Sequence, residues 1–229
     1  DMYYAPLSRS PDTLPYTGTV MAIDPAGRGS DESAYAVMKA LNGYLFLMDV
    51  GGFTEGYSDL ALTQMAQLAK FWQVNEIVVE ANFGDGMFTK LMSPIFSKIH
   101  PCAITEVKNT KQKELRIIDT LEPVLMRHKL IVNQSVIEND YRRYESGQTY
   151  SLIYQMTRIC RDKNAIAHDD RLDAVTMATA YWLSSMDIDG DKKEEGSERS
   201  IEEMMDEGIM VQPEERYERC VKNIKALRS

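Results

Sequence analysis

Length, composition and charge place this chain among ordinary globular proteins and exclude several function classes. Its 229 residues, 44% hydrophobic and 27% charged, can bury one substantial core. A net charge of −9 argues against an indiscriminate nucleic-acid binder, and no apolar run is long enough to span a membrane or serve as a secretory signal. The cysteines match no metal or redox spacing, so we expect free thiols in a reducing compartment: Cys102, Cys160 and Cys220.

The first regular elements predict an antiparallel sheet. Apolar runs typical of strands cover residues 17–24, 34–41 and 44–53. The last two runs are joined by Asn42 and Gly43, the dipeptide most favoured in two-residue hairpins. We therefore expect a three-stranded antiparallel meander.

Helix and strand patterns alternate after the meander. Apolar side chains at helical spacing predict helices over residues 57–73, 84–100 and 111–128, one or two more through about residue 159, and a last helix from Asp169. Short apolar runs predict strands at residues 75–81, 102–107 and 130–132. This order indicates an α/β domain with a mixed sheet and helices on its faces.

The predicted compact domain, residues 18–186, lies between two less regular ends. Residues 1–17 contain three prolines and no clear period, which is typical of a linker or arm. Residues 187–229 hold 13 acidic and 8 basic side chains but few core-forming residues, so we expect a charged C-terminal tail. Its last stretch, residues 213–229, favours a short helix with one apolar side.

Two predicted strands end in a carboxylate. Asp24 ends the first strand and Glu80 ends "EIVVE", and α/β sheets generally place their chemistry at the carboxyl ends of strands. Taken singly, each has an ordinary alternative: Asp24 as the cap of a turn, and Glu80 as the first solvated residue after a strand. Asp85, in a glycine-flanked loop, favours a turn role rather than ligation.

A third group of carboxylates opens the last helix, in "NAIAHDDRLDAVTMATAYWL" (residues 164–183). One carboxylate is enough to cap a helix, but Asp169, Asp170 and Asp173 place three repelling charges within five residues of an apolar segment. Asp170 and Asp173 share a helix face, so a divalent cation between them would convert repulsion into binding. Capping and metal binding both remain open for this segment alone.

Together these carboxylates predict an acidic pocket for hard divalent cations. Mg²⁺ prefers oxygen ligands, and two such ions can stabilise the attacking and leaving oxygens of a phosphoryl displacement. No nucleophilic side chain is then needed, and the sequence contains no G-x-S-x-G, C-x-x-C or H-E-x-x-H motif. It also lacks G-x-x-x-x-G-K-[ST], so ATP hydrolysis by a P-loop is not encoded in this chain.

The order of these motifs resembles a known family. Asp24 before a meander, Glu80 on a later strand and "DRLDAVTMA" on the final helix resemble the ribonuclease H fold, in its RuvC-like branch. The segment "LIYQMTRICRDKNAIAHDDRLDAVTMATAYW" is similar to the end of the nuclease domain in large terminases of podovirus-type phages. The resemblance covers about residues 18–186. It implies a Mg²⁺-dependent endodeoxyribonuclease that cuts concatemeric duplex DNA by two-metal-ion hydrolysis during viral DNA packaging.

The resemblance also implies a set of site residues. It implies two Mg²⁺ ions, replaceable by Mn²⁺, held by the catalytic carboxylates Asp24, Glu80, Asp170 and Asp173. The "HDD" register also admits Asp169 as a metal ligand. His168 has two open interpretations, since it either orders a phosphate or water or caps the turn.

Cations near the predicted pocket are candidate DNA contacts, because phosphate neutralisation supplies most non-specific affinity. Arg28 follows Asp24, and "KNTKQKELR" supplies Lys108, Lys111, Lys113 and Arg116. An ordinary polar helix entrance is the alternative. Sparse aromatic residues in these loops favour backbone contacts over base stacking.

The resemblance implies partners as well as chemistry. These are duplex DNA, an N-terminal ATPase domain of the same polypeptide, the portal protein and the small terminase subunit, all in the host cell cytoplasm. A chain that begins at Asp1 agrees with a part of a longer protein.

Two other functions remain open. One is another ribonuclease H-like nuclease, such as a junction resolvase or RNA–DNA hybrid nuclease. The other is a non-catalytic DNA-binding or capsid-docking module, which predicts damaged carboxylates, whereas none of the expected acidic residues is replaced.

Overall fold

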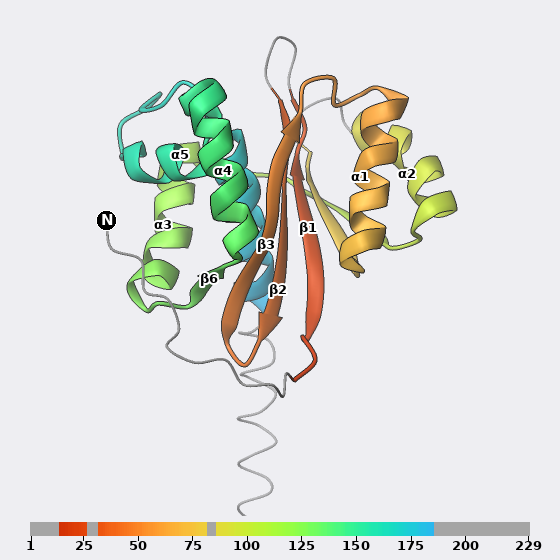
Figure 1. The fold of residues 1–229 in the computed structure, drawn as a ribbon, viewed down its shortest axis with the longest axis horizontal. Helices are drawn as coiled ribbons and strands as arrows, with labels where there is room; N and C mark the ends of the chain where they lie inside the picture. The colour runs from red at the N-terminus through yellow and green to blue at the C-terminus, as the bar shows by residue number, and fades with distance from the viewer. Residues whose placement is uncertain (1–13, 27–31, 82–85, 186–229) are drawn as a thin grey trace, which may run out of the picture. The chain divides into compact units, whose positions relative to one another are not determined.

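A computed structural model describes residues 14–26, 32–81 and 86–185 of the chain. Within these ranges it contains a mixed six-stranded sheet with the strand order β5-β4-β1-β2-β3-β6 and helices on both faces (Figure 1). The predicted α/β class and mixed sheet are therefore confirmed. The predictions for Arg28, Asp85 and residues 187–229 lie outside the described ranges.

The first three strands form the predicted antiparallel meander. They are β1 (Gly18–Asp24), β2 (Ser33–Leu41) and β3 (Tyr44–Phe53), paired in that order. Asn42 and Gly43 have φ values of 52° and 73°, the left-handed conformation that a tight hairpin turn of this kind requires at both central residues.

The remaining strands pair in parallel. They are β4 (Glu76–Glu80) beside β1, β5 (Ala103–Val107) beside β4, and β6 (Leu130–Val132) beside β3. Each is reached through a helical connection, as parallel pairing requires.

The helices follow the predicted order. They are α1 (Asp59–Trp72), α2 (Met87–Ile99), α3 (Lys113–Met126), α4 (Gln134–Gly147), the 3-10 turn η1 (Gln148–Tyr150) and α5 (Leu152–Arg158). Residues 170–185 form a further helix, which we call the last helix, beginning one residue later than predicted. Among the described helices, none combines the length and apolar character needed to cross a bilayer.

The two-residue period of the strands separates two faces of the sheet. Met21 and Ile23 of β1 face α1 and α2, where they join an apolar core with Met65 of α1 and Phe96 of α2. The residues between them along β1 point to the opposite face, because successive side chains of a strand alternate. Asp24 therefore belongs to that opposite face.

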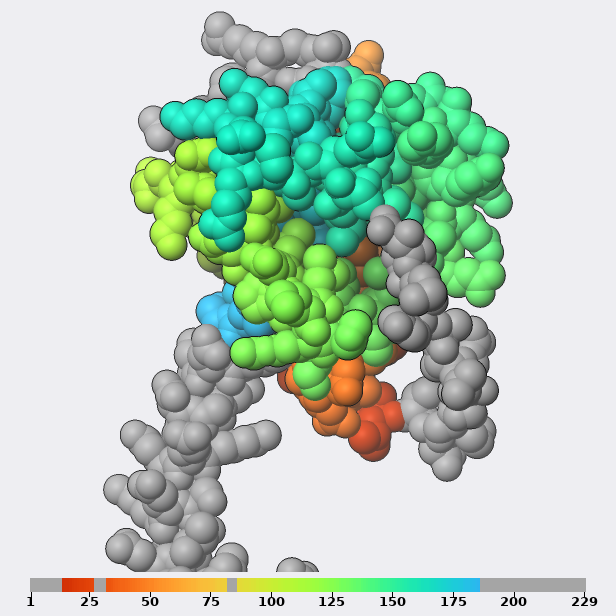
Figure 2. All heavy atoms as spheres, turned by 90° about the vertical axis from the view of Figure 1, so that its left-hand side faces the viewer, coloured from red at the N-terminus to blue at the C-terminus, as the bar shows by residue number. Residues whose placement is uncertain are grey.

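The last helix covers the opposite face of the sheet. Thr179 Oγ1 lies 3.8 Å from Met38 Sδ, and Trp182 Nε1 donates to the Met38 carbonyl at 3.3 Å. Figure 1 shows α1 and α2 on one side of the sheet, with α3, α4, α5 and the last helix on the other. In Figure 2, atoms of α3, α4 and α5 leave little of the last helix visible. Asp173 of the last helix is fully buried, at 0% exposed, whereas Asp170 in its first turn is partly exposed.

Candidate metal centre

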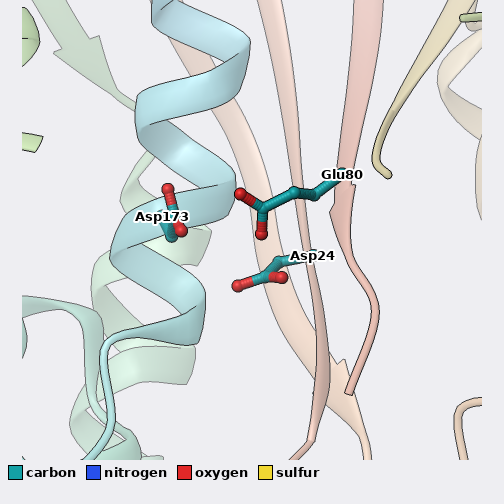
Figure 3. Close-up of side chains that lie close together, drawn as sticks. All are labelled: Asp24, Glu80 and Asp173. Carbon is teal, nitrogen blue, oxygen red and sulfur yellow. The ribbon is translucent and has the colours of Figure 1, made fainter. Parts of the chain in front are cut away.

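Three carboxylates from distant parts of the chain converge between the sheet and the last helix. Asp24 ends β1 and Glu80 ends β4, and these parallel neighbours point toward Asp173 of the last helix (Figure 3). One oxygen of each lies within 4.8 Å of the others. Their exposed fractions are 6% for Asp24, 9% for Glu80 and 0% for Asp173, so little water screens their repulsion.

Lys113, at the start of α3, extends its ammonium group into this acidic cluster. Its Nζ lies 2.7 Å from Asp169 Oδ1, 3.2 Å from Asp173 Oδ2 and 3.6 Å from Asp24 Oδ2. Asp169 precedes the last helix and accepts its first backbone hydrogen bond, from Asp173 N to Asp169 O. One cation thus links the cluster to a fourth carboxylate.

Arg116, one turn further along α3, holds Asp173 with both ends of its guanidinium group. Its Nη1 lies 2.8 Å from Asp173 Oδ1, and its Nη2 donates to Oδ2 at 2.8 Å. The same Nη2 lies 3.5 Å from Glu80 Oε1, to which Asn109 Nδ2 donates at 2.9 Å. This charge-assisted hydrogen bond and the second ion-pair contact restrain the Asp173 carboxylate beside α3.

Negative charge exceeds positive charge at this site, since four carboxylates face two cations. Burial raises the pKa of Asp24 well above its usual value; Lys113 opposes the shift, and the Asp173 and Glu80 carboxylates add to it. Burial alone would lower the pKa of Lys113, but Asp173, Asp24 and Asp169 together raise it, so this ammonium stays charged. The surplus negative charge therefore favours a proton, or a bound cation, at Asp24.

The donor set fits a hard divalent cation. The three converging side chains offer only carboxylate oxygens, the ligands that Mg²⁺ and Mn²⁺ prefer. Asp24 Oδ2 is buried, and its ion-pair partner Lys113 Nζ lies 3.6 Å away, beyond hydrogen-bond distance. A buried acceptor of this kind is expensive unless a partner satisfies it, and a cation would do so.

Asp170 and His168 are not members of the group of converging metal-ligand candidates. Asp170 begins the last helix one turn before Asp173. The ring of His168 stacks on Tyr150, with centroids 4.2 Å apart. The metal role of Asp169 and Asp170 and the auxiliary role of His168 remain predictions.

The predicted DNA contacts fall into two groups. Lys108 and Lys111 are exposed, whereas Lys113 and Arg116 direct their charges inward onto carboxylates. The sequence predicts all four as cations beside the pocket, because spacing shows where α3 begins but not which side chains turn toward the strand ends. Their contact with DNA remains a prediction.

Sequence reasoning missed two features of the site. Asn109 follows β5, the strand beside β4, so the strand-end rule that identified Glu80 would also have identified Asn109. Arg171 lies inside the "HDDRLDA" motif, but its buried partner Glu32 is 139 residues away and no local pattern connects them.

The fold and the carboxylate site together define the structural class of this domain. A mixed sheet that opens with an antiparallel meander, with carboxylates at the ends of β1 and β4 and on the last helix, is a ribonuclease H-like domain. The human cytomegalovirus terminase nuclease domain has a similar fold in its Mn-soaked, inhibitor-bound structure. That match has a TM-score of 0.54 at 16% identity and covers 72% of this chain and 83% of the other. A second structure of the human cytomegalovirus terminase nuclease domain gives a TM-score of 0.51 at 15% identity, covering 73% of this chain and 86% of the other.

Sequence comparison narrows the class to one family. The family model "Terminase Bacteriophage T7, Ribonuclease H-like domain" matches residues 23–130. The chain is 47% identical over 208 residues to the terminase large subunit of Enterobacteria phage T3, covering 88% of this chain and 36% of that protein. It therefore belongs to the family of phage terminase large subunits, and it spans about a third of this relative's length.

Proposed function

We propose that this domain is the metal-dependent endodeoxyribonuclease of a viral DNA-packaging motor, which cuts concatemeric duplex DNA by phosphodiester hydrolysis. One observation carries the proposal: three buried carboxylates converge, with excess negative charge, in a terminase-family ribonuclease H-like domain. A buried cluster of like charges is unfavourable for stability, and such a departure from good packing is expected at functional sites.

The proposed ligands are Asp24, Glu80 and Asp173, with Asp169 or Asp170 completing the set for two Mg²⁺ ions. Mn²⁺ is expected to substitute, because both ions favour oxygen donors. When bound, such ions activate a water molecule and stabilise charge on the attacking and leaving oxygens. The protein therefore needs no nucleophilic side chain of its own.

The chain's own residues orient this site and receive the substrate. Arg116 fixes the Asp173 carboxylate and Asn109 fixes Glu80, so both present defined oxygens to a cation. Lys113 is about one-third exposed, at 34%, and can turn from the carboxylates toward a substrate phosphate. The exposed Lys108 and Lys111 supply phosphate contacts that carry no base specificity.

Two alternatives make different demands. A junction resolvase or hybrid nuclease would use the same carboxylates on another nucleic acid. A non-catalytic docking module would have no need to keep three carboxylates buried together, and this convergence favours an enzyme.

Cleavage assays distinguish these functions. The 229-residue chain is incubated with labelled linear duplex, four-way junction or RNA–DNA hybrid in Mg²⁺, Mn²⁺ or EDTA. We expect linear duplex to be cut in either metal and spared in EDTA. Preferred cutting of junction or hybrid would support a different nuclease, and no cutting of any substrate would support the docking module.

The remaining partners follow from the family rather than from the site. We propose an N-terminal ATPase domain in the same polypeptide, together with the portal protein and the small terminase subunit, acting in the host cell cytoplasm. Co-purification of the full-length protein with portal provides the direct test.

A further inference from the structure

A second buried charge cluster lies outside the carboxylate site. Arg171 Nε donates to Glu32 Oε1 at 2.5 Å, and Arg171 Nη2 donates to Oε2 at 3.1 Å. Arg143 Nη2 of α4 approaches Glu32 Oε2 at 3.7 Å. We call Glu32, Arg171 and Arg143 the glutamate clamp. Glu32 is 2% exposed and Arg171 8%, so this central pair is buried, whereas the Arg143 side chain is 34% exposed.

Arg171 of the clamp lies in the last helix between two of the predicted metal-site residues. Arg171 follows Asp170 directly and precedes Asp173 by two positions, so a shift of Arg171 would carry both carboxylates with it. Arg143 also lies over the Tyr150 ring, 4.9 Å from its centroid, and Tyr150 stacks on His168. The clamp thus contacts the first turn of the last helix and, through Tyr150, the segment that leads into it.

The sheet is shaped to receive the Glu32 side chain. A Cβ atom at Gly52 of β3 would overlap the Glu32 carboxyl group, so glycine leaves the space that the clamp occupies. Gly52 pairs with Ala34 of β2, which on its other side pairs with Asp24 of β1. Glu32 is therefore anchored two residues from the strand partner of a proposed metal ligand.

We infer that Glu32 and Arg171 are positioning residues, which set the rotation and depth of the last helix so that Asp173 reaches Asp24 and Glu80. This inference rests on the proposed metal site. A two-pronged ion pair constrains direction more tightly than apolar packing does, and Arg143 restricts the Glu32 carboxylate further. Stability alone does not explain the clamp, because well-packed apolar residues usually replace a buried ion pair without loss.

The test uses two disruptive variants and a matched control. Glu32→Gln removes the charge, and Gly52→Ala displaces the carboxyl group without altering a charged residue. Asp49→Asn is the control, because Asp49 is a partly buried carboxylate on β3 that accepts from Trp72 Nε1 of α1, on the face of the sheet opposite the last helix. All three variants are compared with wild type under conditions where a thermal melt shows each to be folded.

Three measurements follow for each protein. Calorimetric titration should show Mn²⁺ affinity lowered by about 10–100-fold in both disruptive variants, the usual effect of losing support around metal ligands. Without metal, hydrogen exchange at the Asp173 amide, which donates to Asp169 O at 2.8 Å, should accelerate at least about 10-fold. For duplex cleavage, kcat should fall while KM for DNA stays within about 2-fold, because the exposed lysines are unchanged. Asp49→Asn should match wild type in all three.

Several results would overturn the inference. Wild-type Mn²⁺ affinity in a folded Glu32→Gln or Gly52→Ala protein would do so, as would an equal loss in Asp49→Asn. If Glu32→Gln does not fold, the inference is tested with Gly52→Ala and Arg171→Lys. Lysine keeps the positive charge but cannot donate to both oxygens of Glu32 as the guanidinium group does. Failure of the proposed function would appear separately, as wild-type protein that binds Mn²⁺ but cleaves no nucleic acid.

Discussion

The two faces of the sheet differ in what they bury beside their apolar side chains. The face covered by α1 and α2 is closed by apolar side chains such as Met65 and Phe96. The face covered by the last helix buries charged groups, among them Asp173, Arg171 and Glu32. One face therefore lowers the free energy of the fold, while the other retains a surplus of buried negative charge that a proton or a bound cation can neutralise.

Stability and the proposed chemistry therefore depend on different faces of the sheet. Apolar burial contributes about 25 cal/mol per Å² and needs no partner of opposite charge. A buried carboxylate must be paired or must bind a cation, or it destabilises the fold. Substitutions on the two faces should therefore separate loss of stability from loss of chemistry.

The largest expected change in stability is on the apolar face. Phe96→Ala removes a ring that is 1% exposed, and such truncations typically lower the free energy of unfolding by about 3–5 kcal/mol. Urea denaturation measures the loss. Mn²⁺ affinity, measured by calorimetry in the absence of urea, should remain within about 2-fold of wild type; a parallel loss would mean that the two faces are not separable.

A substitution at Asp24 should instead abolish the chemistry without lowering the stability of the fold. Asp24→Asn should reduce metal-dependent duplex cleavage by at least about 100-fold, because it removes a proposed ligand, and changes around ligands alone cost 10–100-fold. In EDTA the variant should be at least as stable as wild type. Asp49→Asn serves as the control and should cleave normally. Wild-type cleavage by Asp24→Asn would show that the metal site lies elsewhere.

The stability gain at Asp24 should depend on pH. Because burial raises the pKa of this carboxyl group in the folded state, its ionisation destabilises the metal-free fold at neutral pH. Below the pKa of the unfolded group, about 3.9, the side chain is protonated in both states and the penalty disappears. The difference in melting temperature between Asp24→Asn and wild type in EDTA should therefore shrink as the pH falls toward 4. A constant difference would contradict a raised pKa.

The sequence predicted the fold well because the regular spacing of apolar residues within each element is clear and depends on no distant contact. The run from Tyr44 to Phe53 and the Asn42-Gly43 turn specify a hairpin without information from elsewhere in the chain. The break between α4 and α5 was less certain, because the buried Asp140 that accepts from Leu152 N acts through a contact 12 residues away.

The site was predictable only in part. The apolar pattern of a strand shows where the strand ends, and α/β sheets place their chemistry at such ends. Asp24 and Glu80 could therefore be identified from the sequence. The choice among Asp169, Asp170 and Asp173 depends on how the last helix rotates, which no local pattern fixes. The inward turn of Lys113 and the pairing of Glu32 with Arg171 are long-range effects of the same packing.

A smaller effect, on DNA binding rather than on cleavage, is expected from two exposed lysines before α3. Lys108 and Lys111, changed together to Ala, should weaken duplex binding at all sequences, lower the salt slope by roughly 1–2 and leave kcat nearly unchanged. The double variant Lys90→Ala and Lys98→Ala is the matched control, since α2 carries these exposed lysines on the apolar side of the sheet. The affinity of each double variant for fluorescent duplex is measured at increasing salt concentration. Equal salt slopes in the two variants would remove Lys108 and Lys111 from the DNA interface.

The smallest effect on chemistry is expected from removing residues 187–229. This segment carries 13 acidic and 8 basic side chains, so its loss removes net negative charge and should not weaken DNA binding. Because no proposed ligand lies within it, cleavage of naked duplex by residues 1–186 should stay within about 2-fold of the whole chain. The apolar side chains of residues 213–229 favour a partner contact, so the same truncation in the full-length motor should reduce portal binding and packaging. Loss of cleavage would place the segment in the catalytic fold, whereas normal packaging would show that it serves no partner.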